Sequence, residues 1–272
     1  MSSKVDVRRV AAVVGALVAD AAGQPIHWNY NLDRLDAILA ETPEVAFIEP
    51  SINPFYTLPC GSQSGYGDQS FTILKSLVDN NGRCNSLYSI SLNTDALNKA
   101  MYDCFGPDSA YENDTNAIYK DKSDITTKAT KYPIHGPWRH FGIKEFLRNF
   151  QERKESTGSP TDEQIDCAVR IVPVVALYAG RPEMLSRAEV VVRQTQDNDM
   201  CVAVGLAAAR ILEYCILNGR TDGAVEATIE QLSDQDRECP QELDKAVAGF
   251  LREVVRRKSE PHIPVARSIK IS

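Results

Sequence analysis

The chain has 272 residues, of which 43% are hydrophobic and 25% are charged, and its net charge is -7. This composition is that of an ordinary globular protein and excludes disordered, fibrous and membrane-embedded chains. The negative charge opposes attraction to phosphate backbones and anionic lipids, so we expect neither a nucleic-acid partner nor a membrane. The length is near the upper size for one hydrophobic core and predicts a single domain over residues 1–272.

The N-terminal segment joins Lys4, Arg8 and Arg9 to the apolar run VAAVVGALVA. A signal peptide and a mature helix both fit this pattern. We expect a mature helix over residues 5–22, packed close to its neighbours on most sides, because the apolar run continues into DAAGQP. The run is too short for a membrane span.

Helical periodicity dominates the remaining sequence, and no strand-like alternation is longer than four residues. A Ser159 cap followed by Pro160 marks one helix start, and Pro173 is expected to kink that helix. Long polar loops are predicted at 41–66 and 103–140. The fold class is therefore predicted to be all-α. The expected helices are 31–40, one from Gln69 to Asn-Asn-Gly, 85–100, 141–154, 160–180, 183–195, 199–218, 222–233 and 240–258.

The seven cysteines are scattered through the chain and form no CxxC pair. Several lie inside apolar helical patterns, which favours reduced, buried thiols over disulfides or a zinc site. We therefore expect a reducing compartment, and a cytoplasmic location.

Acidic residues stand at the starts of two apolar helices. Asp197 and Asp199 precede the small-residue helix 199–218, and Asp68 follows the glycine-rich stretch GYG at 65–67. Helix N-termini favour carboxylates, so each acid could serve only as a cap. If the two helices share a core, three buried charges would cost several kcal/mol each, and a hard cation would remove that cost.

The order of these motifs resembles the ADP-ribosylglycohydrolase superfamily. The relevant stretches are GALVADAAGQP, the glycine-rich approach to Asp68, and the Asp-x-Asp before a small-residue helix. HWNYNLDRL, NPFYTLPCGSQSGYGDQSF, GPWRHFGIKEFL and TQDNDM resemble the branch that contains the J-type crystallins and selenoprotein J. The resemblance covers roughly residues 10–255. It implies an all-helical domain that binds two Mg²⁺ or Mn²⁺ ions and hydrolyses the glycosidic bond of an ADP-ribosyl group.

The resemblance also implies which residues hold the metal. The family's Thr-Asp-Asp triplet falls on Tyr66, Gly67 and Asp68, and its Asp-x-Asp-Thr/Ser stretch starts at Asp197 and continues through Asp199 to Met200. Only Asp68, Asp197 and Asp199 keep a ligand of the family's kind, and a methionine thioether suits an oxygen-preferring metal poorly. We therefore expect one tightly bound Mg²⁺ or Mn²⁺ ion at most, or none.

Other residues are assigned to the cleft by the same resemblance. His27 stands where many relatives have a glutamate; it is either a base beside Asp68 and Asp199 or a ring packed beside Trp28 and Tyr30. Substrate-binding positions are expected at Gly65, Tyr66, Gly67 and Trp138. Arg139, next to Trp138, either binds a phosphate or belongs to a structural loop.

Two functions are therefore open. The first is metal-assisted hydrolysis of an ADP-ribosyl or related glycosidic bond by an impaired metal site, with Asp68, Asp199 and His27 as catalytic residues. The second is a catalytically inactive protein that binds ADP-ribose or has a crystallin-like structural role. In both, the partner is an ADP-ribose-containing small molecule or an ADP-ribosylated protein.

Overall fold

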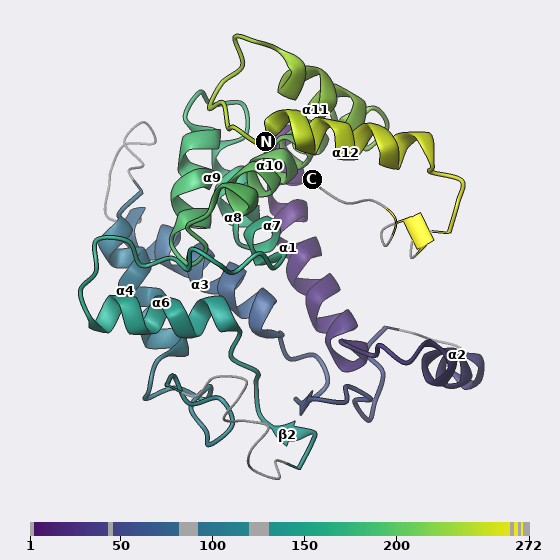
Figure 1. Ribbon diagram of the computed structural model, residues 1–272, viewed down its shortest axis with the longest axis vertical. Coiled ribbons are helices and arrows are strands. Elements are labelled where there is room, and N and C mark those ends of the chain that lie inside the picture. Colours follow the sequence, from purple (N-terminus) through teal and green to yellow (C-terminus); the bar gives the residue numbers. More distant parts are fainter. Residues whose placement is uncertain are drawn as a thin grey trace. The chain divides into compact units, whose positions relative to one another are not determined.

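The computed structural model describes residues 3–42, 46–81, 92–119, 131–261, 264, 265 and 268. It divides into two compact units (Figure 1). Unit 1 comprises Met1–Val13 and Gly158–Ser272, and unit 2 comprises Val14–Thr157. The single domain predicted for residues 1–272 stays a prediction.

Unit 1 is built around one long helix that packs against every other main helix of the unit. This helix is α10, whose alanine-rich and glycine-containing face lets its neighbours approach closely. In Figure 1, α11 and α12 lie side by side next to it. The helices of unit 1 are α7 (Asp166–Arg170), α8 (Val172–Tyr178), α9 (Met184–Arg193), α10 (Asp199–Asn218), α11 (Ala224–Ser233) and α12 (Asp244–Arg256).

Unit 2 contains shorter helices joined by long loops. α3 packs against α4, and α4 packs against α6. The strands are two residues long and run parallel, with Tyr56 opposite Ile134 and Thr57 opposite His135. The elements, the first of which begins in unit 1, are α1 (Lys4–Gly23), the 3-10 helix η1 (Gln24–Ile26), α2 (Leu32–Glu41), β1 (Tyr56–Thr57), α3 (Gly65–Asn81), α4 (Thr94–Phe105), β2 (Ile134–His135) and α6 (Phe141–Gln151).

The all-α prediction is confirmed, and the predicted boundaries of α1, α2, α6 and α9 to α12 are correct to within a few residues. The prediction for 85–100 is only partly tested, because 82–91 lie outside the described residues and α4 begins at Thr94. The expectation that α1 is packed on most sides was wrong. Val7, Val10, Val14 and Val18 are each more than half exposed.

The predicted helix 160–180 begins later than expected. Ser159 Oγ accepts the backbone N–H groups of Thr161 and Asp162, but the chain then stays non-helical until Asp166. A side chain distant in the sequence explains this late helix start, because Gln196 donates to the carbonyl of Gln164 at 2.8 Å. The helix is then interrupted before Pro173, as a proline there requires.

Within the described residues, α10 is the one helix that is long and apolar enough to cross a membrane. Half of its apolar stretch is buried inside the protein, and the core helix of a globular protein meets the same criteria. We therefore interpret α10 as the central core helix of unit 1.

Candidate functional site

The start of α3 is held by a carboxylate from the end of α1. Asp20 accepts two hydrogen bonds from Ser64, from the backbone N–H at 2.7 Å and from the hydroxyl at 2.6 Å. Ser64 Oγ in turn accepts the N–H of Tyr66, one of the donors that a helix start leaves unpaired. α3 therefore begins at Gly65 and not at Gln69 as predicted, and Asp68 lies inside its first turn.

The position of the Asp20 carboxylate also explains why residue 67 is a glycine. A Cβ atom at this position would overlap the carboxylate of Asp20 and the side chain of Gln63, and would lie 2.8 Å from the Asp20 Cγ atom. The space that a carboxylate at residue 67 would need is therefore filled by Asp20. The family ligand that the sequence lacks cannot be restored here unless Asp20 moves.

Asp68 is held by a buried tyrosine. The hydroxyl of Tyr111, which is 3% exposed, donates to Asp68 Oδ2 at 2.6 Å. Burial raises the pKa of Asp68, the Tyr111 hydrogen bond opposes that rise, and the negative charge of Asp20 adds to it. Burial, together with the charge of Asp68, likewise raises the pKa of Tyr111. Asp68 Oδ1 accepts no hydrogen bond from the described residues and is available to a ligand.

Rings gather beside the start of α3 in what we call the aromatic cluster. The ring of Tyr66 lies 4.2 Å from that of His140 and 5.7 Å from that of His27, measured between centroids. A Cβ atom at Gly65 would lie 3.1 Å from the Trp138 carbonyl oxygen, so this glycine permits the close approach. The aromatic cluster consists of His27, Trp28, Tyr30, Phe55, Tyr56, Tyr66, Tyr132, Trp138 and His140.

His27 packs beside Trp28 as one interpretation expects, and its role as a base stays a prediction. Its ring stacks with Trp28 at 6.4 Å, and its Nδ1 lies 3.2 Å from the hydroxyl of Tyr56. Burial lowers the pKa of His27. The negative charge of Asp20 opposes this decrease, and His140 adds to it. The imidazole is therefore neutral near pH 7 and retains one nitrogen that can accept a proton.

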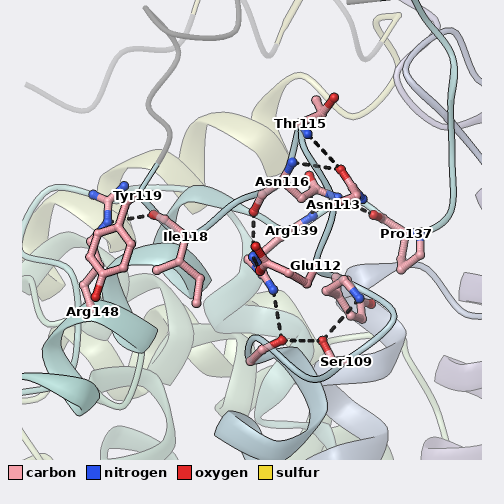
Figure 2. A network of polar contacts seen from close by, with 12 residues as sticks. Ser109, Glu112, Asn113, Thr115, Asn116, Ile118, Tyr119, Pro137, Arg139 and Arg148 are labelled. Atoms are coloured by element: carbon pink, nitrogen blue, oxygen red, sulfur yellow. Dashed lines mark hydrogen bonds and ion pairs between the residues drawn. The ribbon is translucent and has the colours of Figure 1, made fainter.

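Arg139 is a structural residue and not an exposed phosphate ligand. It is 1% exposed and donates to the Glu112 carboxylate at 2.6 Å, to the Asn116 carbonyl at 2.6 Å and to the Gly106 carbonyl at 3.1 Å. Figure 2 shows this network around the guanidinium group. The loop 106–116 is thereby tied to the segment that carries Trp138 and His140.

The network also fixes the position of Tyr111. This residue precedes Glu112, one of the partners of Arg139, and its hydroxyl reaches Asp68. The side chain of Asn116 donates to the Pro137 carbonyl at 2.6 Å, a second link between the same two segments (Figure 2). Arg139 therefore supports the geometry of Asp68 from a distance.

In unit 1, the acids before α10 have different surroundings. Asn198 is the helix cap, since its Oδ1 accepts the N–H of Cys201 at 2.9 Å. Asp197 Oδ1 accepts a hydrogen bond from Arg193 at 2.7 Å and forms an ion pair with it. Asp199 is exposed, lies in the first helical turn and has no side-chain partner among the described residues. The alternative interpretation, in which Asp197 and Asp199 cap the helix, does not hold, because Asn198 is the cap.

The predicted metal ligands are thus divided between the units, Asp68 in unit 2 and Asp197 and Asp199 in unit 1. Neither unit contains, among its described residues, a group of at least three His, Cys, Asp or Glu side chains that could hold a metal ion. Whether the three carboxylates meet stays a prediction. By donor chemistry, Asp68 Oδ1 and Asp199 suit a hard cation, whereas the Asp20 carboxylate at Gly67 leaves no room for a further aspartate. The expectation of one ion at most stays a prediction.

Sequence reasoning identified His27, Gly65, Tyr66 and Trp138, which lie in or against the aromatic cluster, and Asp68, which follows in the first turn of α3. It missed the residues that hold them in place. Asp20 lies in an apolar helix, and Tyr111 lies in a polar, irregular segment without periodicity. The residues missed are Asp20, Tyr56, Ser64, Tyr111 and His140.

Comparisons with known proteins agree with this fold. The model of the ADP-ribosylglycohydrolase family matches residues 1–270. Crystallin J1A of Tripedalia cystophora is 34% identical over 227 residues, which are 84% of this chain and 64% of that protein. Crystallin J1B of the same organism is 35% identical over 219 residues, 80% of this chain and 61% of that protein.

The fold and the match over nearly the whole chain place this protein in the ADP-ribosylglycohydrolase family. Members of the family act on ADP-ribosylated substrates. The matched segments span 64% and 61% of the lengths of the two crystallins, less than two thirds in each case.

Proposed function

We propose that the protein is an ADP-ribosyl glycoside hydrolase with an impaired metal site that holds at most one Mg²⁺ or Mn²⁺ ion. Its substrate would be an ADP-ribose-containing small molecule or an ADP-ribosylated protein. The observation that carries this proposal is the arrangement at the start of α3. There, one oxygen of Asp68 is fixed by Tyr111 and the other accepts no hydrogen bond from the described residues, while Tyr66, two residues earlier in the same helix, belongs to the aromatic cluster.

In this proposal each residue has a separate role. Asp68, Asp197 and Asp199 hold the cation, which when bound would orient the ribose hydroxyls and polarise a water molecule. Neutral His27 accepts the proton of the attacking water and returns it to the leaving group as the glycosidic bond breaks. Tyr66 and Trp138 offer ring faces to a nucleobase.

A second function is favoured by specific contacts. Tyr111 occupies one oxygen of Asp68, and Arg193 occupies one oxygen of Asp197, so protein groups already satisfy part of the ligand set. The similarity to two crystallins points in the same direction. This alternative is a protein that binds ADP-ribose without hydrolysing its glycosidic bond.

Turnover distinguishes the two functions. The wild-type protein would be incubated with peptides ADP-ribosylated on arginine and on serine, with Mn²⁺ or with a chelator, and free ADP-ribose would be measured. Release that needs Mn²⁺ and is lost in Asp68→Asn supports the hydrolase. The matched control is Asp36→Asn, an exposed acid on α2. Binding of ADP-ribose in calorimetry without any release supports the second function, and the absence of both contradicts the two proposals.

A further inference from the structure

A pair of cysteines lies in unit 1, apart from the residues assigned above to catalysis and binding. Cys167 on α7 and Cys201 on α10 line the same cavity, and each thiol influences the pKa of the other. Both sulfur atoms also lie 3.9 Å from the same carbonyl oxygen, that of Gln164. Rotation of the side chains can bring together two sulfur atoms that share one acceptor at this distance.

The two thiols are accessible to small molecules, although their side chains are only 1% and 2% exposed. Both line an open, mostly apolar cavity of about 510 Å³, whose other walls include Met200 and Phe250. A small uncharged oxidant can enter a cavity of this kind, whereas a charged reagent pays a desolvation cost.

One of the thiols is prepared for reaction. The neighbouring Cys201 thiol lowers the pKa of Cys167, against the effect of burial, and the nearby Arg170 guanidinium lowers it further. Arg170 is 1% exposed and donates to Gln196 at 2.8 Å, so its positive charge stays fixed beside the thiol. A thiolate is the form of cysteine that reacts with peroxides.

We propose that Cys167 and Cys201 are a peroxide-sensitive dithiol that closes to a disulfide between α7 and α10. The Cys167 thiolate attacks one oxygen of hydrogen peroxide, which forms a sulfenic acid and releases hydroxide. The Cys201 sulfur then attacks the sulfenic sulfur, a second hydroxide leaves, and the two thiol protons complete two water molecules. The dithiol loses two electrons and the peroxide gains two. This inference does not depend on the proposed function.

Oxidation would have a local structural effect. The thiol of Cys201 donates to the carbonyl of Asp162 at 3.2 Å, a carbonyl that also accepts Asn198 at 2.8 Å. Disulfide formation removes the thiol donor, and with it one of the contacts that join the segment 159–165 to the start of α10. The backbone of this segment should then exchange its amide hydrogens faster.

The test is peptide mapping of the folded full-length chain after treatment with hydrogen peroxide, with near-UV circular dichroism showing that the fold is kept. We expect one linked peptide pair containing Cys167 and Cys201, lighter by two hydrogen atoms and restored by dithiothreitol. The pair should persist in Cys215→Ser and disappear in Cys167→Ser. Recovery of both residues as unlinked thiols while the exposed Cys60 is oxidised would overturn the proposal, and this wild-type result needs no variant to fold.

Discussion

The starts of α3 and α10 carry the acids of the predicted metal site, but their supports differ. At α3, a carboxylate, a serine, a glycine and a buried tyrosine hold Asp68 in one position. At α10, an asparagine caps the helix, Asp197 pairs with a partly exposed arginine, and Asp199 faces solvent.

If both helix starts hold one cation, as we propose, the ligand set combines a rigid half and an adaptable half. A carboxylate fixed by a buried hydrogen bond has little freedom, whereas an exposed one retains its rotamers and adjusts to a ligand. We therefore expect substitutions around α3 to reduce stability and substitutions at the start of α10 to leave it nearly unchanged.

The largest effect is expected from Arg139→Met. The change leaves the Glu112 carboxylate and two carbonyl groups without their donor, which should lower the free energy of unfolding by about 3 kcal/mol. Urea denaturation measures this loss of unfolding free energy. The control is Lys131→Met, because Lys131 is an exposed residue of the same unit. A loss equal to that of the control would show that the network does not hold unit 2 together.

Gly67→Ala comes next. The added methyl group overlaps the Asp20 carboxylate, and the rearrangement should cost about 2 kcal/mol. The matched control is Gly249→Ala in α12, where nothing lies within 4 Å of the added atom. This control should gain about 0.5 to 1 kcal/mol from helix propensity. If both alanine variants were stabilised in thermal denaturation, the close approach of Asp20 would be refuted.

Tyr111→Phe should cost about 1.5 kcal/mol near neutral pH in metal-free protein, because a hydrogen bond to a carboxylate is lost. The effect should depend on pH. The pKa of Asp68 is raised in the folded state. Its favourable contribution to the free energy of unfolding is therefore full below the unfolded-state pKa, and it is lost as the pH rises through the folded-state pKa.

In the wild type, the hydrogen bond from Tyr111 favours the ionised form of Asp68. Its loss in Tyr111→Phe should therefore raise the pKa of Asp68 further. The difference from wild type should therefore be larger near neutral pH than under acidic conditions where Asp68 is protonated. Denaturation at several pH values measures this trend. A difference that does not change with pH would mean that the tyrosine does not act on Asp68.

The smallest effect is expected from Asp197→Asn, which removes a partly exposed ion pair with Arg193 and should cost about 0.5 kcal/mol. High salt should reduce the difference from wild type, because exposed charges are screened. Chemical denaturation at low and high salt measures it. A cost as large as that of Tyr111→Phe would show that both helix starts are equally rigid.

The helices were predicted well from the sequence where the residues of the helix itself determine its limits. α10 carries an unbroken small-residue pattern, and its predicted range of 199–218 is the observed one. Prediction failed where a distant side chain decides the local structure. The early start of α3 depends on Asp20, and the delayed start of α7 depends on Gln196. Local propensity contains no information on either contact.

The candidate site shows the same division. His27, Tyr66 and Asp68 could be found because they stand in recognisable motifs of the family. Tyr111 could not, since it lies in a polar segment whose conformation is set by Arg139. The residues proposed to bind a ligand thus carried a sequence signal, whereas the residues that hold them in place did not.

The most direct test of the account is a Mn²⁺ titration in which free Mn²⁺ is measured by electron paramagnetic resonance. It would use the wild-type protein and the variants Asp68→Asn and Asp199→Asn. We predict one tightly bound ion per chain in the wild type and none in either variant, because both carboxylates hold the same ion. Two bound ions in the wild type, or undiminished binding in one of the variants, would contradict a single shared site.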